Sequence, residues 1–356
     1  MNNKLDKILK IIQSSSTSQI EFDREAILAE YNAQEDNKSS IAIKILSVIG
    51  GFLATLAFLG FLLLSVLKNS EIGMIITGFV FIAISVILNR KSDKLIIDTF
   101  SISTNAVGIF LMIFGLGELG VDENIITVLV ILIALTLLYL TQNYILSLVS
   151  ILAISISLLT LLVFLNDSYN LIHLYNVIIL VAMVYTFLFE AKIIKNSPKL
   201  SRIYNPLRIA LVISFLFGLG FLRTRNLHGM TVNYTWSYSI ILFAAVIYII
   251  SKIIKVINIT SEIHKIGIYA LSSVILVLTA LSPSISGTIL LILISFYVNY
   301  KFGFALGIIA LIYAVSQYYY DLNYTLLTKS IMLFISGILF IVLYLFTTKT
   351  IKNEEI

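Results

Sequence analysis

Long apolar runs separated by short polar breaks fill most of this chain. Unbroken runs of about 17 to 25 residues recur between Ile41 and Phe346, and a helix of that length can cross a hydrocarbon core about 30 Å thick. The pattern predicts an all-α, polytopic transmembrane helix bundle with short loops. We expect about 12 spans, near residues 43–67, 72–89, 97–116, 124–140, 144–165, 171–189, 207–222, 237–257, 266–282, 285–299, 302–319 and 326–346.

The basic residues divide unequally between the two ends of these predicted spans. With the N-terminus inside, fourteen lysines and arginines lie on the inner side, before the N-terminal tail is counted. The outer side receives Lys68, Arg223, Arg225 and Lys329. Because cytoplasmic loops carry an excess of positive charge, the distribution predicts that both termini are cytoplasmic.

The loops divide the chain into five segments. An amphipathic cytoplasmic tail (1–40) precedes the first six spans (41–189), and a basic central cytoplasmic loop (190–206) precedes the second six (207–347), which a short cytoplasmic tail (348–356) follows. The pairs Ser197-Pro198 and Asn205-Pro206 predict helix ends within the central loop, because the residue before a proline avoids the α-helical region.

Composition narrows the classes of function. The chain is 59% hydrophobic and 12% charged, with a mean hydropathy of +1.01, whereas an ordinary soluble domain is about 25% charged. Its formal charge of +5 follows from the topology and does not indicate nucleic-acid binding. It has no cysteine, and its three histidines divide between opposite predicted faces, which excludes a three-histidine metal site. With no nucleotide-binding glycine loop and only short outer loops, we expect no enzyme, metal or cofactor.

Lys329 is the most distinctive charged residue, because it lies inside the last predicted span. An ionisable group in a span costs about 3 kcal/mol on insertion scales unless it reaches the surface or pairs. Three interpretations remain open. Lys329 can extend to the head groups, form an ion pair with the carboxylate of Asp321 or Glu118, or contribute to a substrate site.

Two other groups of residues lie on the predicted outer face. Tyr318, Tyr319 and Tyr320 are typical of an aromatic belt, and a stacking surface for a sugar or quinone is the alternative. Arg223 and Arg225 lie where basic residues are otherwise scarce. They anchor the loop at the interface or bind an anionic group, since guanidinium groups suit phosphate oxygens.

Small and polar side chains within the spans predict helix contacts. The third span opens with polar groups at helical spacing, which we expect to face the interior: Asp98, Ser101, Thr104 and Asn105. Small residues four apart predict close helix approach: Ala210, Ser214 and Gly218, and Gly303 and Gly307. No acidic residue lies at mid-depth in a predicted span, which counts against ion-coupled transport.

The segment from Tyr318 to Ser330, followed by Gly337, resembles the C-terminal signature of domain-of-unknown-function family 4401, a bacterial polytopic membrane family. The positions that carry the resemblance are Tyr319, Tyr320, Leu327, Lys329 and Ser330. Members are often encoded beside a small membrane-anchored protein with a Gly-Asp-Tyr motif. The resemblance implies a protein of the bacterial cytoplasmic (inner) membrane that works in the lipid bilayer with such a partner.

Our leading hypothesis is therefore a non-enzymatic envelope protein in which Asp321 and Lys329 close the outer end of the bundle. The alternative is a transporter or flippase for an anionic or lipid-linked small molecule, which would use Arg223, Arg225 and Lys329.

Overall fold

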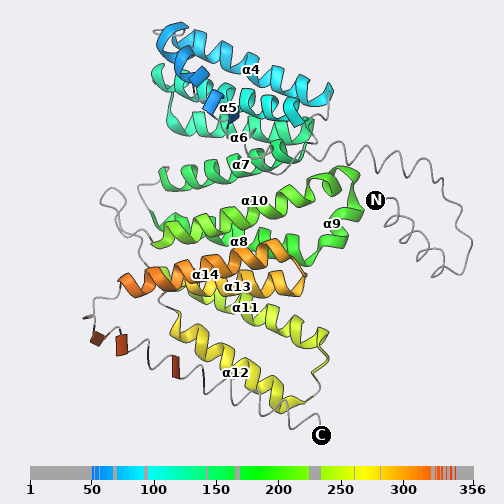
Figure 1. Cartoon of the computed structure of the whole chain (residues 1–356), viewed down its shortest axis with the longest axis vertical. Helices are drawn as coiled ribbons and strands as arrows, with labels where there is room; N and C mark the ends of the chain where they lie inside the picture. Colours follow the sequence, from blue (N-terminus) through cyan, green and yellow to red (C-terminus); the bar gives the residue numbers. More distant parts are fainter. Residues whose placement is uncertain are drawn as a thin grey trace, which may run out of the picture.

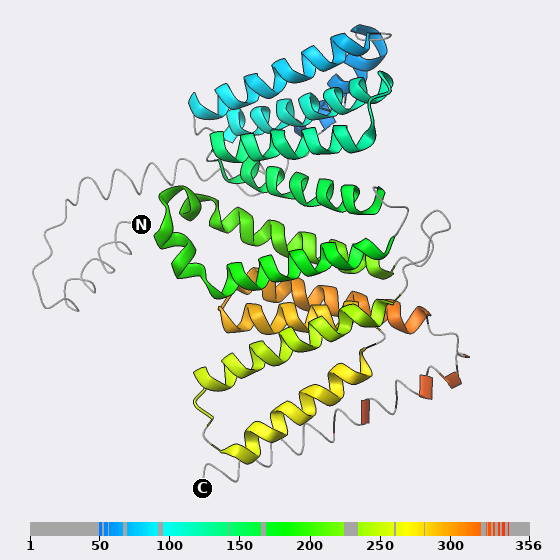
Figure 2. The same ribbon diagram turned by 180° about the vertical axis from the view of Figure 1, so that it is seen from behind.

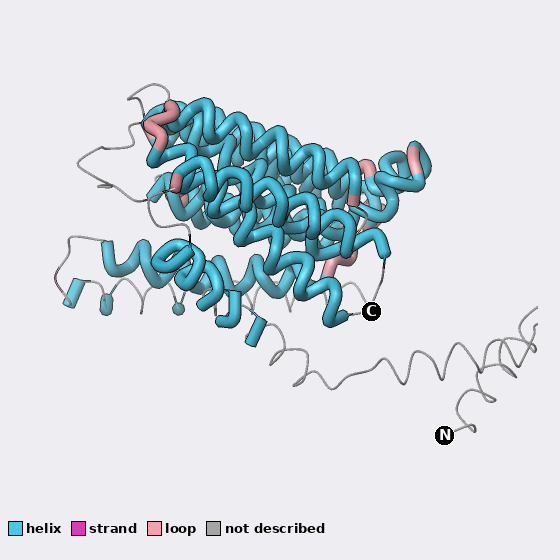
Figure 3. The backbone as a smooth tube through the Cα atoms, turned by 90° about the horizontal axis from the view of Figure 1, so that it is seen from above, coloured by secondary structure: helices cyan, strands magenta, loops and turns pink. Residues whose placement is uncertain are grey.

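A computed structural model describes residues 50–51, 53–55, 57–66, 70–91, 95–141, 143–164, 169–223, 234–259, 261–280, 282–321, 325, 327–328, 330–331, 334, 337–338 and 341. Within these ranges the chain forms helices and turns without a strand (Figure 3). Both predicted tails lie outside them. The labelled helices are η1 (Leu62–Val66), α4 (Glu71–Lys91), α5 (Leu95–Glu118), α6 (Glu123–Leu140), α7 (Tyr144–Phe164), η2 (Tyr169–Leu171), α8 (Ile172–Leu188), α9 (Glu190–Asn196), α10 (Pro198–Arg223), α11 (Thr235–Val256), α12 (Glu262–Leu278), α13 (Pro283–Tyr297) and α14 (Lys301–Asp321).

The long helices are stacked along the longest axis of the molecule. In Figure 1 they follow one another from α4 at the top, through α5, α6 and α7, to α10 and α8 in the middle, then α14, α13 and α11, and α12 at the bottom. The view from behind gives the same order (Figure 2). Sequence order and spatial order therefore agree in the first half, while α8, α10, α11, α13 and α14 cluster in the second.

The apolar helices suit a membrane. Seven are long and apolar enough to cross one, and within the described ranges they are Glu71–Asn89, Phe100–Glu118, Glu123–Leu140, Tyr144–Leu162, Lys199–Leu222, Trp236–Val256 and Lys301–Tyr320. Shorter apolar helices cover Leu53–Ser65, Ile172–Leu188 and Pro283–Tyr297. The predicted spans from 72–89 to 302–319 coincide one by one with α4 to α8 and α10 to α14. The count of twelve and the inward orientation of both termini stay predictions.

The region 190–206 differs from the irregular loop we expected. Ser197 is extended and separates α9 from α10, so the first proline pair ends a helix as predicted. The second pair does not, because α10 continues through Pro206. A proline inside a helix removes one hydrogen bond and crowds the preceding turn. Burial of Tyr204 and Pro206 against neighbouring helices favours the helix in spite of this.

Glycines and serines let α4 and α5 pack closely. A Cβ added at Gly78 would lie 2.6 Å from the carbonyl oxygen of Gly108, and one added at Gly108 would lie 2.7 Å from that of Gly78. One end of the same contact is held by Ser101, whose hydroxyl donates to the Ser85 carbonyl at 2.8 Å. Ser101 and Asn105 are buried, as predicted, whereas Thr104 is only partly buried and donates to the Phe100 carbonyl of its own helix; the side chain of Asp98 is not described.

The main apolar core lies in the second half, where α10 contacts α7, α8, α9 and α13. Small residues on α10 allow this: Ala210, Ser214 and Gly218 are all buried, as their spacing predicted. Gly303 and Gly307 likewise allow α14 to approach α13 closely. This close packing brings the polar ends of the helices together.

Candidate functional site

An arginine and three aromatic rings meet where α8 ends and α10 begins. This arginine cluster consists of Arg208, Glu190, Tyr204, Phe187 and Tyr300. The Arg208 guanidinium lies over the Tyr300 ring, 3.8 Å from its centroid, with the Tyr204 and Phe187 centroids at 5.3 and 5.9 Å. One guanidinium nitrogen lies 3.6 Å from a carboxylate oxygen of Glu190. The cluster thus ties four elements together: α8, α9, α10 and the α13–α14 turn.

Local backbone geometry places Tyr300 in this cluster. Asn299 adopts a left-handed conformation with φ of 55°, which asparagine tolerates better than most residues. The Tyr300 amide donates to the Ser295 carbonyl at 2.7 Å and closes the turn. A Cβ at Gly303 would lie 2.5 Å from the Tyr300 ring, so this position needs a glycine. The turn therefore holds the ring against Arg208.

The electrostatics of the cluster favour a fixed ion pair. The Arg208 side chain is 14% exposed and that of Glu190 is 41% exposed, so the carboxylate remains partly hydrated. Burial raises the pKa of the Tyr300 hydroxyl, and the nearby Arg208 charge offsets part of that rise. Tyr300 therefore stays neutral and presents an intact π face to the guanidinium, an arrangement that favours cation–π attraction.

Some hydrogen-bonding capacity in this region is unused. The Nε of Arg208, the hydroxyl of Tyr300 and the hydroxyl of Ser295 are buried without a hydrogen-bond partner. Buried polar groups usually have one.

The arginine cluster as a whole can hold the ends of the four elements together.

A second polar cluster lies at the opposite end of α10. The hydroxyls of Tyr175 and Ser155 share a hydrogen bond of 2.8 Å, and the Tyr238 hydroxyl donates to the Asn176 carbonyl at 3.4 Å. A Cβ at Gly218 would collide with the side-chain oxygen of Asn176, so a larger residue there would force that side chain to move. These groups are uncharged and join α7, α8, α10 and α11.

The predicted outer-face residues are only partly described. Glu118 is exposed at the end of α5, and Asp321 is the last residue of α14. In both ribbon views α6, α7 and α10 lie between α5 and α14 (Figures 1 and 2). The stack therefore does not bring the helix of Glu118 beside that of Asp321. Lys329 lies outside the described residues, and its pairing stays a prediction.

The remaining predicted positions lie at helix ends. Tyr318 and Tyr319 are partly buried in the last turn of α14, while Tyr320 is 73% exposed. The rings of Tyr319 and Tyr320 meet edge to face at 5.8 Å. Arg223 is the last residue of α10, and its side chain is not described. Arg225 falls outside the described ranges. Anion binding by this pair stays a prediction.

The arginine cluster was not predicted from the sequence. Arg208 counted there only among the basic residues at the inner ends of the spans, and Glu190 was placed at the start of the central loop. The available signal was spacing, because Tyr204 and Arg208 lie four residues apart and share a helix face. Stopping the helix at Pro206 removed that signal.

A comparison with known protein families matches residues 41–350 to the family described as Domain of unknown function (DUF4401). The chain belongs to this family. The match covers nearly all of the chain and confirms the resemblance first drawn from its C-terminal segment. No curated protein and no solved structure matches the chain. The DUF4401 chain is thus a protein with several membrane-capable helices whose family carries no assigned activity.

Proposed function

We propose that this DUF4401 protein is a non-enzymatic protein of the bacterial inner membrane that works with a small membrane-anchored partner. Family membership and the seven apolar helices support its place in a membrane. The chemistry of its buried polar groups supports a role without catalysis. The partner is an expectation that follows from the family resemblance.

One observation carries the proposal. Apart from the tyrosines, every buried polar residue among the described side chains is a serine, threonine or asparagine: Ser85, Asn89, Ser101, Asn105, Thr141, Ser147, Ser150, Ser155, Ser157, Asn176, Thr186, Ser214, Ser239, Ser282, Ser286, Thr288 and Ser295. These side chains do not titrate near neutral pH and join helices through hydrogen bonds. Among the described residues, no group of three histidine, cysteine, aspartate or glutamate side chains could hold a metal ion. An interior of this kind suits a helix bundle that keeps one fixed arrangement, here called the frame.

The outer end of α14 is the proposed contact for the partner. It presents an exposed Tyr320 and ends at Asp321. An exposed aromatic ring at this end suits a short extracytoplasmic segment that carries a tyrosine, as the Gly-Asp-Tyr motif of the expected partner does. The proposed Asp321–Lys329 pair would hold this end of the bundle closed. Lys329→Ala and Asp321→Ala should each lower the unfolding temperature in detergent, and two unchanged temperatures would remove the pair from the proposal.

A crosslinking experiment tests the partner. Because the chain has no cysteine, a single cysteine at Tyr320 can carry a photoactivatable benzophenone in native membranes. Tyr139 provides the matched control, since it is 70% exposed and lies at the predicted inner end of α6. We expect one small membrane protein to be captured at Tyr320 and not at Tyr139. Adducts with lipid alone, or the same adducts at both positions, would contradict the partnered role.

The transporter alternative depends on Arg223, Arg225 and Lys329. The side chains of all three fall outside the described residues. It predicts that reconstituted protein moves an anionic or lipid-linked molecule across a vesicle membrane without a second protein. A flux that Arg223→Gln abolishes would replace the partnered role with this one.

A further inference from the structure

Helices α11 and α12 meet at one end and separate at the other. At the closed end the Ser239 hydroxyl donates to the Ala280 carbonyl at 2.6 Å, and Leu276 is buried in the main core. The two helices spread toward the turn that joins them in both ribbon views (Figures 1 and 2). The open end contains a cavity of about 360 Å³, the headgroup cavity, lined by Ile254, Lys255, Asn258, Ile259 and Lys265.

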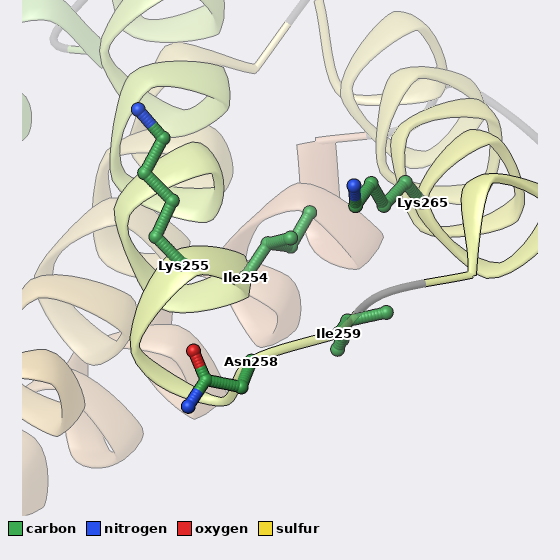
Figure 4. Close-up of a pocket in the computed structure, with 5 residues that line it drawn as sticks. All are labelled: Ile254, Lys255, Asn258, Ile259 and Lys265. Carbon is green, nitrogen blue, oxygen red and sulfur yellow. The ribbon is translucent and has the colours of Figure 1, made fainter.

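The cavity combines an apolar wall with the side chains of two lysines, and only the Lys265 ammonium points into the gap (Figure 4). Ile254 of α11 is 5% exposed. Lys265 extends from α12 into the gap toward Ile254, while Lys255 rises along α11 (Figure 4). At a membrane surface, an open cavity between α11 and α12 would be in contact with the surrounding lipid. Lipid acyl chains and head groups are therefore available to occupy the cavity.

Lys265 already has a partner that it can exchange. Its ammonium lies 2.7 Å from a carboxylate oxygen of Glu262, three residues earlier on α12. The Glu262 side chain is 77% exposed, and exposed ion pairs of this kind are weak. Because this ion pair is weak, the phosphate group of a ligand can replace the Glu262 carboxylate as the partner of Lys265. Glu262 therefore acts as an internal competitor for an anionic ligand.

Exposed apolar residues surround the same turn. Val256, Ile257, Ile263 and Ile266 are all more than half exposed. Exposing these apolar side chains to water has a free-energy cost. At the boundary of head groups and acyl chains their burial is favourable, especially beside basic residues. The turn thus lies at the membrane surface, and the positive-inside pattern assigns it to the cytoplasmic leaflet, where anionic lipids attract lysines.

We propose that the headgroup cavity binds the phosphate of an anionic phospholipid, with an acyl chain against Ile254 and Ile259. Lys265 is the charge partner that points into the gap, and Lys255 is a second one once its side chain turns toward the ligand. A free phosphate ion shares the charge chemistry but gains nothing from the two isoleucines, so the apolar wall favours the lipid. The proposal depends on a membrane location for α11 and α12 and is independent of the partner protein.

Native mass spectrometry of the full-length protein in detergent tests the site. We expect phosphatidylglycerol to bind more tightly than phosphatidylcholine. The double variant Lys255→Gln/Lys265→Gln should weaken phosphatidylglycerol binding about 30-fold, since each lysine near a membrane surface contributes about 1 kcal/mol. Glu262→Gln should strengthen it about 5-fold by freeing Lys265. The double control Lys192→Gln/Lys195→Gln removes two exposed charges of α9 and should leave the affinity unchanged.

The gain at Glu262→Gln separates a binding role from a folding role, because a damaged protein does not bind more tightly. Equal affinity for the two lipids, or an unchanged affinity in the lysine double variant, overturns the proposal. Inorganic phosphate that displaces the lipid at millimolar concentration also overturns it, since the site would then recognise the free ion. Unfolding temperatures in lipid-free detergent verify that each variant is folded.

Discussion

Removing Arg208 should loosen the end of the bundle where α8, α9, α10 and the α13–α14 turn meet. Arg208→Ala deletes a guanidinium that lies 3.8 Å from the Tyr300 ring centroid and 3.6 Å from Glu190. A desolvated cation–π contact contributes about 2 kcal/mol. The ion pair adds about 0 to 1 kcal/mol, because Glu190 is 41% exposed and regains water when its partner is lost. We expect a total loss of about 2 to 3 kcal/mol, below the cost of breaking a fully buried pair.

These magnitudes rank the variants of the cluster. Stacking contributes more than the ion pair, so Glu190→Gln should cost less than Arg208→Ala. Arg208→Lys should not restore stability, since an ammonium lacks the plane that stacks on Tyr300. Lys195→Ala is the control, because this lysine is exposed in the last turn of α9.

The assay is thermal unfolding in detergent, in which the fraction of protein that remains monodisperse is measured after heating to each temperature. Arg208→Ala should lower the midpoint by several degrees, and Lys195→Ala should leave it unchanged. Two results would refute the reasoning: an Arg208→Ala protein that unfolds with the wild type, or a Glu190→Gln protein that is less stable than Arg208→Ala. The second would make the ion pair the main contact of the cluster.

Three further predictions concern the first half of the chain and its topology. Gly78→Leu should cost at least about 2 kcal/mol by forcing α4 from α5, whereas Gly117→Leu, where an added Cβ meets nothing within 4 Å, should be neutral in the same unfolding assay. Ser101→Ala should cost about 0.6 kcal/mol, the typical contribution of a hydrogen bond between membrane helices, measured by the same unfolding midpoint. A cysteine at Ser197 should react with an impermeant maleimide only in opened cells and one at Asp122 in intact cells; the reverse pattern would invert the predicted topology.

The helical spans were predictable because each is a long apolar run bounded by polar residues. The prediction of 72–89 against Glu71–Lys91 for α4 shows how closely such a run defines a helix. The interior face of α5 was predictable for a similar reason, since Ser101 and Asn105 repeat at helical spacing. Close helix contacts followed from glycines and small residues four apart.

The path of α10 through Pro206 was not predictable from local preference. A local sequence rule considers only the hydrogen bond that a proline removes from a helix. In the folded protein, the burial of Tyr204 and Pro206 against neighbouring helices offsets that loss. The arginine cluster was hidden for the same reason, because it joins residues separated by up to 113 positions, from Phe187 to Tyr300. Spacing along one helix reveals a shared face but not which distant turn packs on it.

The two ends of α10 are joined to their neighbours by different chemistry, and this bears on what the frame can do. At one end a permanent cation rests on aromatic rings, and at the other neutral hydroxyl and amide groups pair around Gly218. A guanidinium keeps its charge and the hydroxyl and amide groups stay neutral near neutral pH. In the proposed non-enzymatic role, the activity of the bundle depends on what binds to its surface. That reasoning directs experiments to the exposed end of α14 and to the cavity between α11 and α12.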